Sequence, residues 1–259
     1  MSDNRSIGVF DSGLGGLTVL SAITQKFPNE SILYLGDTAR LPYGTKSPET
    51  VIKYALSNAE ALMSKAELKL LVVACNTATA HALPTLAAQL PIPVIGVIEP
   101  GALEVAKNPQ IKSVAVLATA GTTQSKAYEI ALRKHGFEGE IFSLACPLFV
   151  SLVEEGLVTG PIAELTVKHY LSQLPHEPDA VILGCTHYPL LLPTLRKALP
   201  AKTIWVDSGS ATASHLEFEP CDKPGSVRYF VTDTPKRFQE LSSLFLGKPV
   251  LATQLEQVL

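Results

Sequence analysis

An internal repeat of strand-like segments limits the fold of this 259-residue chain more than any other feature. In each copy a short apolar run leads into small polar residues, and a second apolar run ends in a cysteine. Ser12 and Cys75 follow the two runs of the first copy and lie 63 positions apart. Thr119 and Cys185 follow those of the second copy and lie 66 positions apart. Two matching pairs in the same order, at nearly the same spacing, indicate two similar halves.

Short apolar runs alternate with longer amphipathic stretches along the chain, which is typical of parallel strands joined by crossover helices. We expect strands at residues 7–10, 31–35, 70–74, 94–97, 114–118, 140–144, 180–183, 203–206 and 229–232. We expect helices to include residues 48–62, 121–135 and 235–246. Gly136, directly after the second of these, is typical of a helix end.

The predicted fold class is α/β, with two similar domains whose mostly parallel sheets are flanked by helices. The boundary falls near residues 99–101, and the second domain is complete by about Val206. We therefore expect the chain end to return to the first half. The predicted domains are residues 1–97 plus 210–259, carrying Cys75, and residues 98–209, carrying Cys185. The active site is expected in the cleft between them.

Charge and hydropathy exclude several classes of protein. The formal net charge is −3 and no Lys/Arg-rich run is present, which argues against nucleic-acid binding. No apolar run approaches the roughly 20 residues of a membrane span. The polar N-terminus lacks the pattern of a signal peptide. Four cysteines are too few for a disulfide framework, so we expect a cytoplasmic enzyme.

The two repeated cysteines are the strongest candidates for chemistry. Ligands of open α/β sheets bind outside the carboxyl ends of the strands, where Cys75 and Cys185 are expected. Either cysteine alone is better explained as a small buried residue at a strand end. As a matched pair on opposite walls, one thiolate and one thiol can remove a proton from one face of a carbon and return one to the other. The pair therefore favours inversion of a tetrahedral carbon.

Polar residues near the same strand ends are further candidates. Asp11 and Ser12 open a glycine-rich loop that suits an anion such as a carboxylate, with a tight strand-to-helix turn as the alternative. Tyr43 and Gly44 can contact a ligand or only form a turn. His187 is placed to assist Cys185.

Three other residues are weaker candidates: Glu154 has two open interpretations, and Cys146 and Cys221 have no counterpart in the repeat. Glu154 lies either on a solvated helix face or in the cleft. Cys146 and Cys221 lack a mirrored context, so we expect them to be structural. A zinc site would need ligands beyond Cys185 and His187 that the sequence does not supply in a motif.

These residues lie in segments that resemble bacterial glutamate racemases nearly end to end. The matching motifs are Val9-Phe10-Asp11-Ser12-Gly13-Leu14-Gly15-Gly16, Gly36-Asp37-Thr38-Ala39-Arg40-Leu41-Pro42-Tyr43-Gly44, Ala74-Cys75-Asn76-Thr77-Ala78-Thr79, Leu183-Gly184-Cys185-Thr186-His187-Tyr188-Pro189 and Val206-Asp207-Ser208-Gly209. Phe230-Val231-Thr232-Asp233 and Arg237-Phe238 also fit. Each motif is modestly specific, whereas the ordered set is highly specific.

The resemblance implies an amino-acid racemase that interconverts L- and D-glutamate for peptidoglycan synthesis, with no pyridoxal phosphate, metal or nucleotide cofactor. It assigns Cys75 and Cys185 as the acid/base pair, assisted by Asp11 and His187. It assigns substrate binding to Asp11, Ser12, Tyr43, Gly44, Asn76, Thr77, Thr186 and His187, with Asp37, Glu154 and Thr119 as secondary candidates. It also implies a homodimer. Some members need a cell-wall precursor as activator; for this chain, whose first expected strand begins at residue 7, that regulation stays open.

Three alternatives compete with a glutamate racemase. An aspartate racemase, or a decarboxylase or isomerase of a related diacid, would keep the fold, but a decarboxylase needs only one proton donor. A binding module for a dicarboxylate would leave the two thiols without a role. A Cys-His hydrolase needs one nucleophilic cysteine rather than a mirrored pair.

Overall fold

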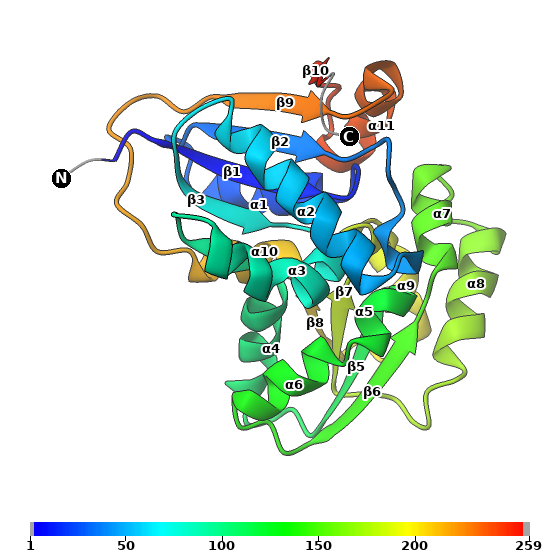
Figure 1. The fold of residues 1–259 in the computed structure, drawn as a ribbon. Helices are drawn as coiled ribbons and strands as arrows, with labels where there is room; N and C mark the ends of the chain where they lie inside the picture. The colour runs from blue at the N-terminus through cyan, green and yellow to red at the C-terminus, as the bar shows by residue number, and fades with distance from the viewer. Residues whose placement is uncertain (1–2, 256–259) are drawn as a thin grey trace.

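Two sheets of parallel strands organise the computed structural model, which describes residues 3–255 (Figure 1). The first sheet has the order β10-β9-β2-β1-β3-β4 and the second has the order β6-β5-β7-β8. The strands of the first sheet are β1 Ser6–Asp11, β2 Ile32–Gly36, β3 Leu68–Val73, β4 Val94–Gly96, β9 Val227–Val231 and β10 Ala252–Gln254. Those of the second are β5 Ser113–Ala118, β6 Glu140–Ala145, β7 Ala180–Gly184 and β8 Ile204–Asp207.

The two sheets repeat one topology. The order β2-β1-β3-β4 in the first matches β6-β5-β7-β8 in the second, with a central strand that pairs on both sides. The predicted fold class, two similar α/β halves, is therefore confirmed. All nine predicted strands are present, whereas the short edge strand β10 was not expected.

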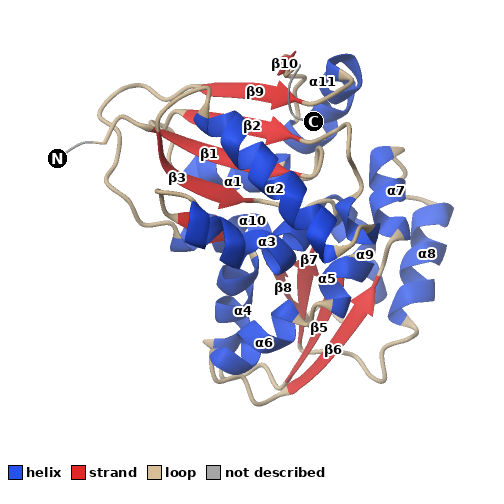
Figure 2. Cartoon of the chain, viewed as in Figure 1, coloured by secondary structure: helices blue, strands red, loops and turns tan. Residues whose placement is uncertain are grey.

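Helices cover both faces of each sheet, as Figure 2 shows. Their bounds are α1 Leu17–Lys26, η1 Tyr43–Thr45, α2 Pro48–Met63, α3 Asn76–Gln89, α4 Ile98–Ala106, α5 Ala120–Gln124, α6 Ala127–Lys134, α7 Leu148–Glu154, α8 Pro161–Leu171, η2 Tyr188–Leu191, α9 Leu192–Ala198, α10 Ser208–His215 and α11 Pro235–Leu246. Helices α2 and α3 pack on one face of the first sheet, and α1, α10 and α11 on the other. Because both faces are buried, the strands are continuous apolar runs.

The single helix predicted at residues 121–135 is wrong, because two helices occupy this segment. Lys126 has a left-handed backbone, with φ of 55°, and it separates α5 from α6. The Ser125 hydroxyl accepts from the backbone N–H of Ala127 at 3.2 Å, which supports the break. The predicted end at Gly136 is confirmed: its φ is +81°, and Phe137 N–H donates to the carbonyl of Leu132 in a Schellman turn.

The C-terminal part of the chain returns to the first half. Strands β9 and β10 complete the first sheet beside β2, and α11 packs on the same sheet. Helix α10 contacts both α1 and α4, so it lies against both halves. The domain boundaries at 97/98 and 209/210 stay a prediction, and residues 1–2 and 256–259 lie outside the described residues.

Within residues 3–255, no helix combines the length and apolar character that a membrane crossing requires.

Candidate active site

A narrow cavity lies between the two halves, at the carboxyl ends of β1 and β3 on one side and β5 and β7 on the other. Its lining is Ser12, Gly13, Leu41, Pro42, Tyr43, Gly44, Cys75, Asn76, Thr77, Thr119, Val150, Glu154, Cys185, Thr186 and His187. The cavity volume is about 40 Å³, which is room for a few water molecules. The two thiols therefore face a small enclosed space rather than bulk water.

The cavity brings together most of the predicted site residues, including both repeated cysteines. Asp11 and Asp37 do not line it. Both are fully buried directly behind the cavity, where they accept hydrogen bonds from residues that line it: Gly13 and Thr186 donate to Asp11, and Tyr43 donates to Asp37. The functional roles of all these residues stay predictions.

The first wall holds Cys75 as a protonated thiol. Cys75 is the N-cap of α3, and its Sγ accepts from the backbone N–H of Ala78 at 3.5 Å. The thiol donates to the Ser12 hydroxyl at 3.5 Å. Burial, reinforced by the nearby charge of Asp11, raises the pKa of Cys75 to about 12.

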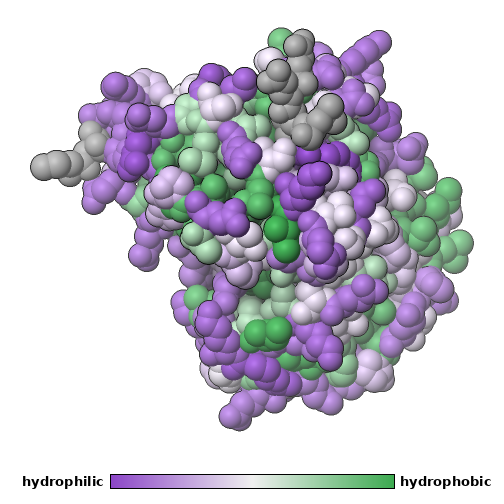
Figure 3. All heavy atoms as spheres, in the orientation of Figure 1, coloured by the Kyte–Doolittle hydropathy of each residue, from purple (hydrophilic) through white to green (hydrophobic). Residues whose placement is uncertain are grey.

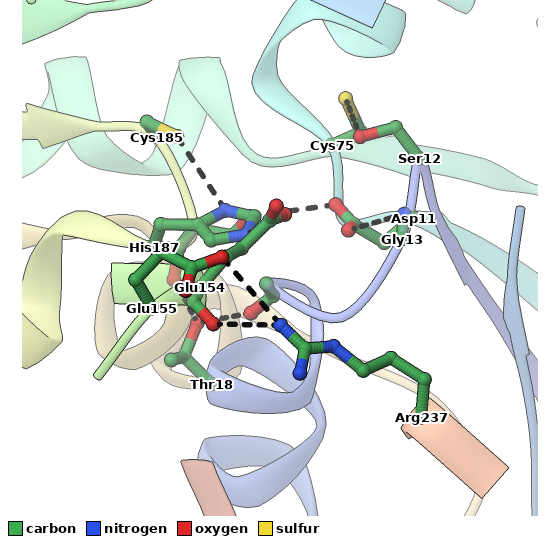
Figure 4. Close-up of polar contacts among 12 residues, drawn as sticks. Asp11, Ser12, Gly13, Thr18, Cys75, Glu154, Glu155, Cys185, His187 and Arg237 are labelled. Atoms are coloured by element: carbon green, nitrogen blue, oxygen red, sulfur yellow. Dashed lines mark hydrogen bonds and ion pairs between the residues drawn. The ribbon is translucent and has the colours of Figure 1, made fainter. Parts of the chain in front are cut away.

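The second wall holds Cys185 beside a charged imidazole. Cys185 Sγ lies 3.9 Å from His187 Nδ1, and His187 Nε2 lies 3.2 Å from Glu154 Oε1 (Figure 4). Burial opposes the charge on His187, but the hydrogen bonds to Cys185 and Glu154 outweigh it and raise the pKa to about 10. The imidazole of His187 thus has a partner at each ring nitrogen, with Cys185 on one side and Glu154 on the other.

The glycine-rich loop after β1 binds a carboxylate of the protein itself. Asp11 accepts from the backbone N–H of Gly13 at 2.9 Å, and the N–H of Gly16 also hydrogen-bonds to it. Burial raises the pKa of Asp11, and the charge of His187 and these N–H groups oppose that rise. The contact from Gly13 forms a tight turn closed by Asp11, and a site for a ligand anion at this loop stays a prediction.

Gly15 in the same loop allows the two halves to meet closely. A Cβ atom at Gly15 would lie 2.5 Å from Nδ1 of His187 and closer still to Oγ1 of Thr186. Thr186 also donates from its hydroxyl to Asp11 at 3.4 Å, and its carbonyl accepts from Thr18 of α1 at 3.0 Å. The loop is therefore shaped to fit the segment that follows Cys185.

A buried network holds the segment of Tyr43 and Gly44. The Tyr43 hydroxyl donates to Asp37, which also accepts from the Arg40 guanidinium at 2.8 Å. Asn58 of α2 donates to the Tyr43 hydroxyl at 3.0 Å and accepts from Arg40 at 2.8 Å. The Tyr43 hydroxyl is thus turned into the network, and Gly44 packs against Thr119 of the other half.

Asn58 is a residue that the sequence interpretation missed. It occupies a core position of α2, in line with the buried side chains Val51, Ala55 and Leu62. A polar side chain on the apolar face of a predicted helix was the available signal, because a buried amide requires hydrogen-bond partners.

The other two cysteines lie outside the cavity. Cys146 donates to the carbonyl of Leu144 at 3.6 Å, and Cys221 donates to Oδ1 of Asn4 at 2.9 Å. Over residues 3–255, no three or more His, Cys, Asp or Glu side chains gather as a metal site would require.

Comparison with known proteins identifies the family. The family model described as Asp/Glu/Hydantoin racemase matches residues 7–216. The chain belongs to this family. It is therefore a racemase, an isomerase with an opposed pair of thiols in its cavity.

Individual relatives agree with this assignment over nearly the whole chain. The glutamate racemase of Aquifex aeolicus is 46% identical over 94% of this chain and 95% of the relative. The crystal structure of a glutamate racemase from Bacillus anthracis matches with a TM-score of 0.93 at 37% identity, covering 98% of both chains. A glutamate racemase from Francisella tularensis, solved in complex with D-glutamate, matches with a TM-score of 0.89 at 37% identity, again over 98% of both chains.

Proposed function

We propose that this racemase interconverts L- and D-glutamate, using Cys75 and Cys185 to remove and return the α-proton. The observation that carries the proposal is the pair of thiols, which follow equivalent strands of two similar halves and line the two sides of one cavity. The substrate follows from the relatives, which are glutamate racemases at up to 46% identity over most of the chain.

The charges in the cavity suit one acid and one base. In one direction the Cys185 thiolate takes the α-proton and becomes a thiol, leaving the electron pair on the α-carbon. The Cys75 thiol then gives its proton to the opposite face of that carbon and becomes a thiolate. In the other direction the two cysteines exchange roles, so that no proton is gained or lost in either direction. Coupled groups of this kind titrate as a pair.

The remaining site residues divide into binding and supporting groups. We propose that the small polar groups on the cavity wall bind the carboxylates and the ammonium group of the substrate: Ser12, the Tyr43-Gly44 backbone, Asn76, Thr77, Thr119 and Thr186. Asp11 and His187 act on their neighbouring thiols; His187 lines the cavity, whereas Asp11 acts from directly behind it. Asp37 and Glu154 support Tyr43 and His187, respectively.

The test is incubation of the pure protein with L-glutamate in deuterated water, without added cofactor. Loss of optical rotation together with deuterium at the α-carbon is expected. The proposal fails if neither enantiomer exchanges its α-proton. Parallel incubations with aspartate separate glutamate from the shorter diacid.

Single substitutions test the two-thiol mechanism. Cys75→Ser and Cys185→Ser are each expected to abolish racemisation, because a serine hydroxyl is far too weak an acid to exchange roles with a thiol. Cys221→Ser is the matched control, since its thiol is buried outside the cavity beside Asn4. Full activity in either of the first two variants would contradict the mechanism.

We also propose that the enzyme is cytoplasmic, acts as a homodimer and supplies D-glutamate for peptidoglycan, as its family resemblance implies. Apolar side chains exposed on α7 and α8 are available to a second copy: Leu148 is 53% exposed, Ile162 57% and Leu165 68% (Figure 3). Sedimentation equilibrium of the pure protein tests the dimer. A monomer at all concentrations would contradict it.

A further inference from the structure

A chain of buried hydrogen bonds joins the segments that carry the two site cysteines. The Tyr128 hydroxyl donates to Oδ1 of Asn76 at 2.7 Å. The Asn76 amide donates to the Ser208 hydroxyl at 3.3 Å, and Ser208 donates to the carbonyl of Leu183 at 3.1 Å. The chain runs from α6 through α3 to the start of α10 and ends on β7, elements that meet where the two halves join (Figure 1).

This chain of hydrogen bonds includes residues close in the sequence to both site cysteines. Asn76 directly follows Cys75 and is the first residue of α3. Leu183 lies in β7, two positions before Cys185. The single hydroxyl of Ser208 thus contacts both cysteine-bearing segments, one from each half.

Solvent does not replace these bonds if they are lost. Asn76 is 3% exposed and Ser208 and Tyr128 are each 2% exposed. Removal of one hydroxyl therefore leaves a buried donor or acceptor without a partner, which drives local rearrangement. The hydroxyls of Tyr128 and Ser208 also lie 3.4 Å from each other, and both bond to Asn76, so a change at either hydroxyl reaches Asn76.

The element that carries Ser208 is itself held firmly. The Asp207 carboxylate caps α10 by accepting from the backbone N–H of Ser210 at 2.8 Å. A Cβ at Gly209 would lie 3.1 Å from the carbonyl oxygen of Thr18, so this glycine lets α10 approach α1 closely. The Asp207-Ser208-Gly209 motif therefore fixes the hydroxyl of Ser208 relative to the sheets of both halves.

We propose that Ser208 and Tyr128 are positioning residues, which hold Cys75 and Cys185 at the separation that proton transfer on both faces requires. This inference rests on the proposed two-thiol function. Neither residue lines the cavity, so both act through Asn76 and Leu183. The Asn76 amide is held by its oxygen and one N–H at the wall of the cavity.

The test compares Ser208→Ala and Tyr128→Phe with the wild-type enzyme, measuring kcat and KM in both directions. Because a displacement of about 1 Å costs on the order of 100-fold in rate, we expect kcat to fall about 10- to 100-fold in each variant. Tyr128→Phe removes one oxygen and keeps the ring that packs on Gly184, so it serves even if Ser208→Ala does not fold. The double variant should lose little more than the worse single variant, because the two hydroxyls contact each other and share Asn76 as a partner.

Thr194→Val is the matched control. Thr194 is 2% exposed, and its hydroxyl makes one buried hydrogen bond, to the carbonyl of Val158 at 2.7 Å, away from the cavity. This variant should lose thermal stability and keep kcat. Either test variant with kcat within about threefold of wild type, or an additive loss in the double variant, overturns the positioning role. An inactive wild-type enzyme would instead overturn the proposed function, so the two failures are distinguishable.

Discussion

Substitution of Gly15 tests whether the close fit between the two halves sets the geometry of the site. A Cβ added here would lie 2.5 Å from Nδ1 and 2.7 Å from Cε1 of His187, whereas ordinary contacts begin near 3.4 Å. His187 must therefore move away by about 1 Å, and with it the contacts to Cys185 and Glu154. Since a misplacement of this size costs on the order of 100-fold in rate, Gly15→Ala is expected to lower kcat/KM by about that factor.

The assay is racemisation of L- and D-glutamate followed by optical rotation, with thermal unfolding measured on the same samples. Gly101→Ala is the matched control. Gly101 lies in helix α4, and a Cβ there would meet the Tyr128 ring at 3.6 Å, which is an ordinary van der Waals contact that requires no movement of this residue. That variant should keep full activity. A folded Gly15→Ala enzyme with kcat/KM within about threefold of wild type would refute the argument that the loop sets the position of His187.

Three further outcomes follow from the charged groups. Glu154→Gln removes one of the hydrogen bonds that raise the pKa of His187 to about 10. The alkaline limb of the profile of kcat/KM against pH should therefore move to lower pH. An unmoved limb would contradict the role of Glu154. The pKa of His187 in the folded protein lies above its ordinary value of 6.5, so its protonation stabilises the fold. This contribution of His187 to the free energy of unfolding should be complete below about pH 6.5 and lost as the pH rises through about 10. Urea unfolding measured across this pH range tests it. Lys69→Met leaves the carboxylate of Glu30 buried without its partner at 2.6 Å, and should lower the free energy of unfolding by about 3–5 kcal/mol with little change in activity; unchanged urea unfolding would refute this.

The sequence predicts the strands and the position of both cysteines at one cavity, because both depend on local pattern. Continuous apolar runs identify strands buried on both faces, and the repeat places Cys75 and Cys185 after equivalent strands. The error at Lys126 has a local cause of another kind. Its left-handed backbone interrupts a segment whose apolar spacing suits one helix, and that spacing does not register a single unusual residue.

Contacts between distant parts of the chain were beyond the sequence interpretation. The need for glycine at position 15 arises from Thr186 and His187, which only the folded arrangement brings to the loop. Likewise, Ser208 was recognised as part of a motif, but its bonds to Asn76 and Leu183 cross between two halves. Side chains whose partners lie on the other half have no periodic signal, since periodicity reports only which face of an element is buried.

The two halves repeat a backbone path but not a charge distribution, and the proposed mechanism depends on that difference. Two thiols in identical surroundings would often both be protonated, which leaves no base, or both ionised, which leaves no acid. Here burial, reinforced by the charge of Asp11, raises the pKa of Cys75 to about 12, whereas Cys185 lies beside the imidazole of His187, whose own pKa is raised to about 10. Thr119, the counterpart of Ser12, bonds to Thr77 and Thr122 rather than to a cysteine, so the second half uses imidazole where the first uses a hydroxyl. Inversion with Cys75 as the proton donor and inversion with Cys75 as the base therefore start from different protonation states of the pair, and the surroundings of Cys75 favour the first.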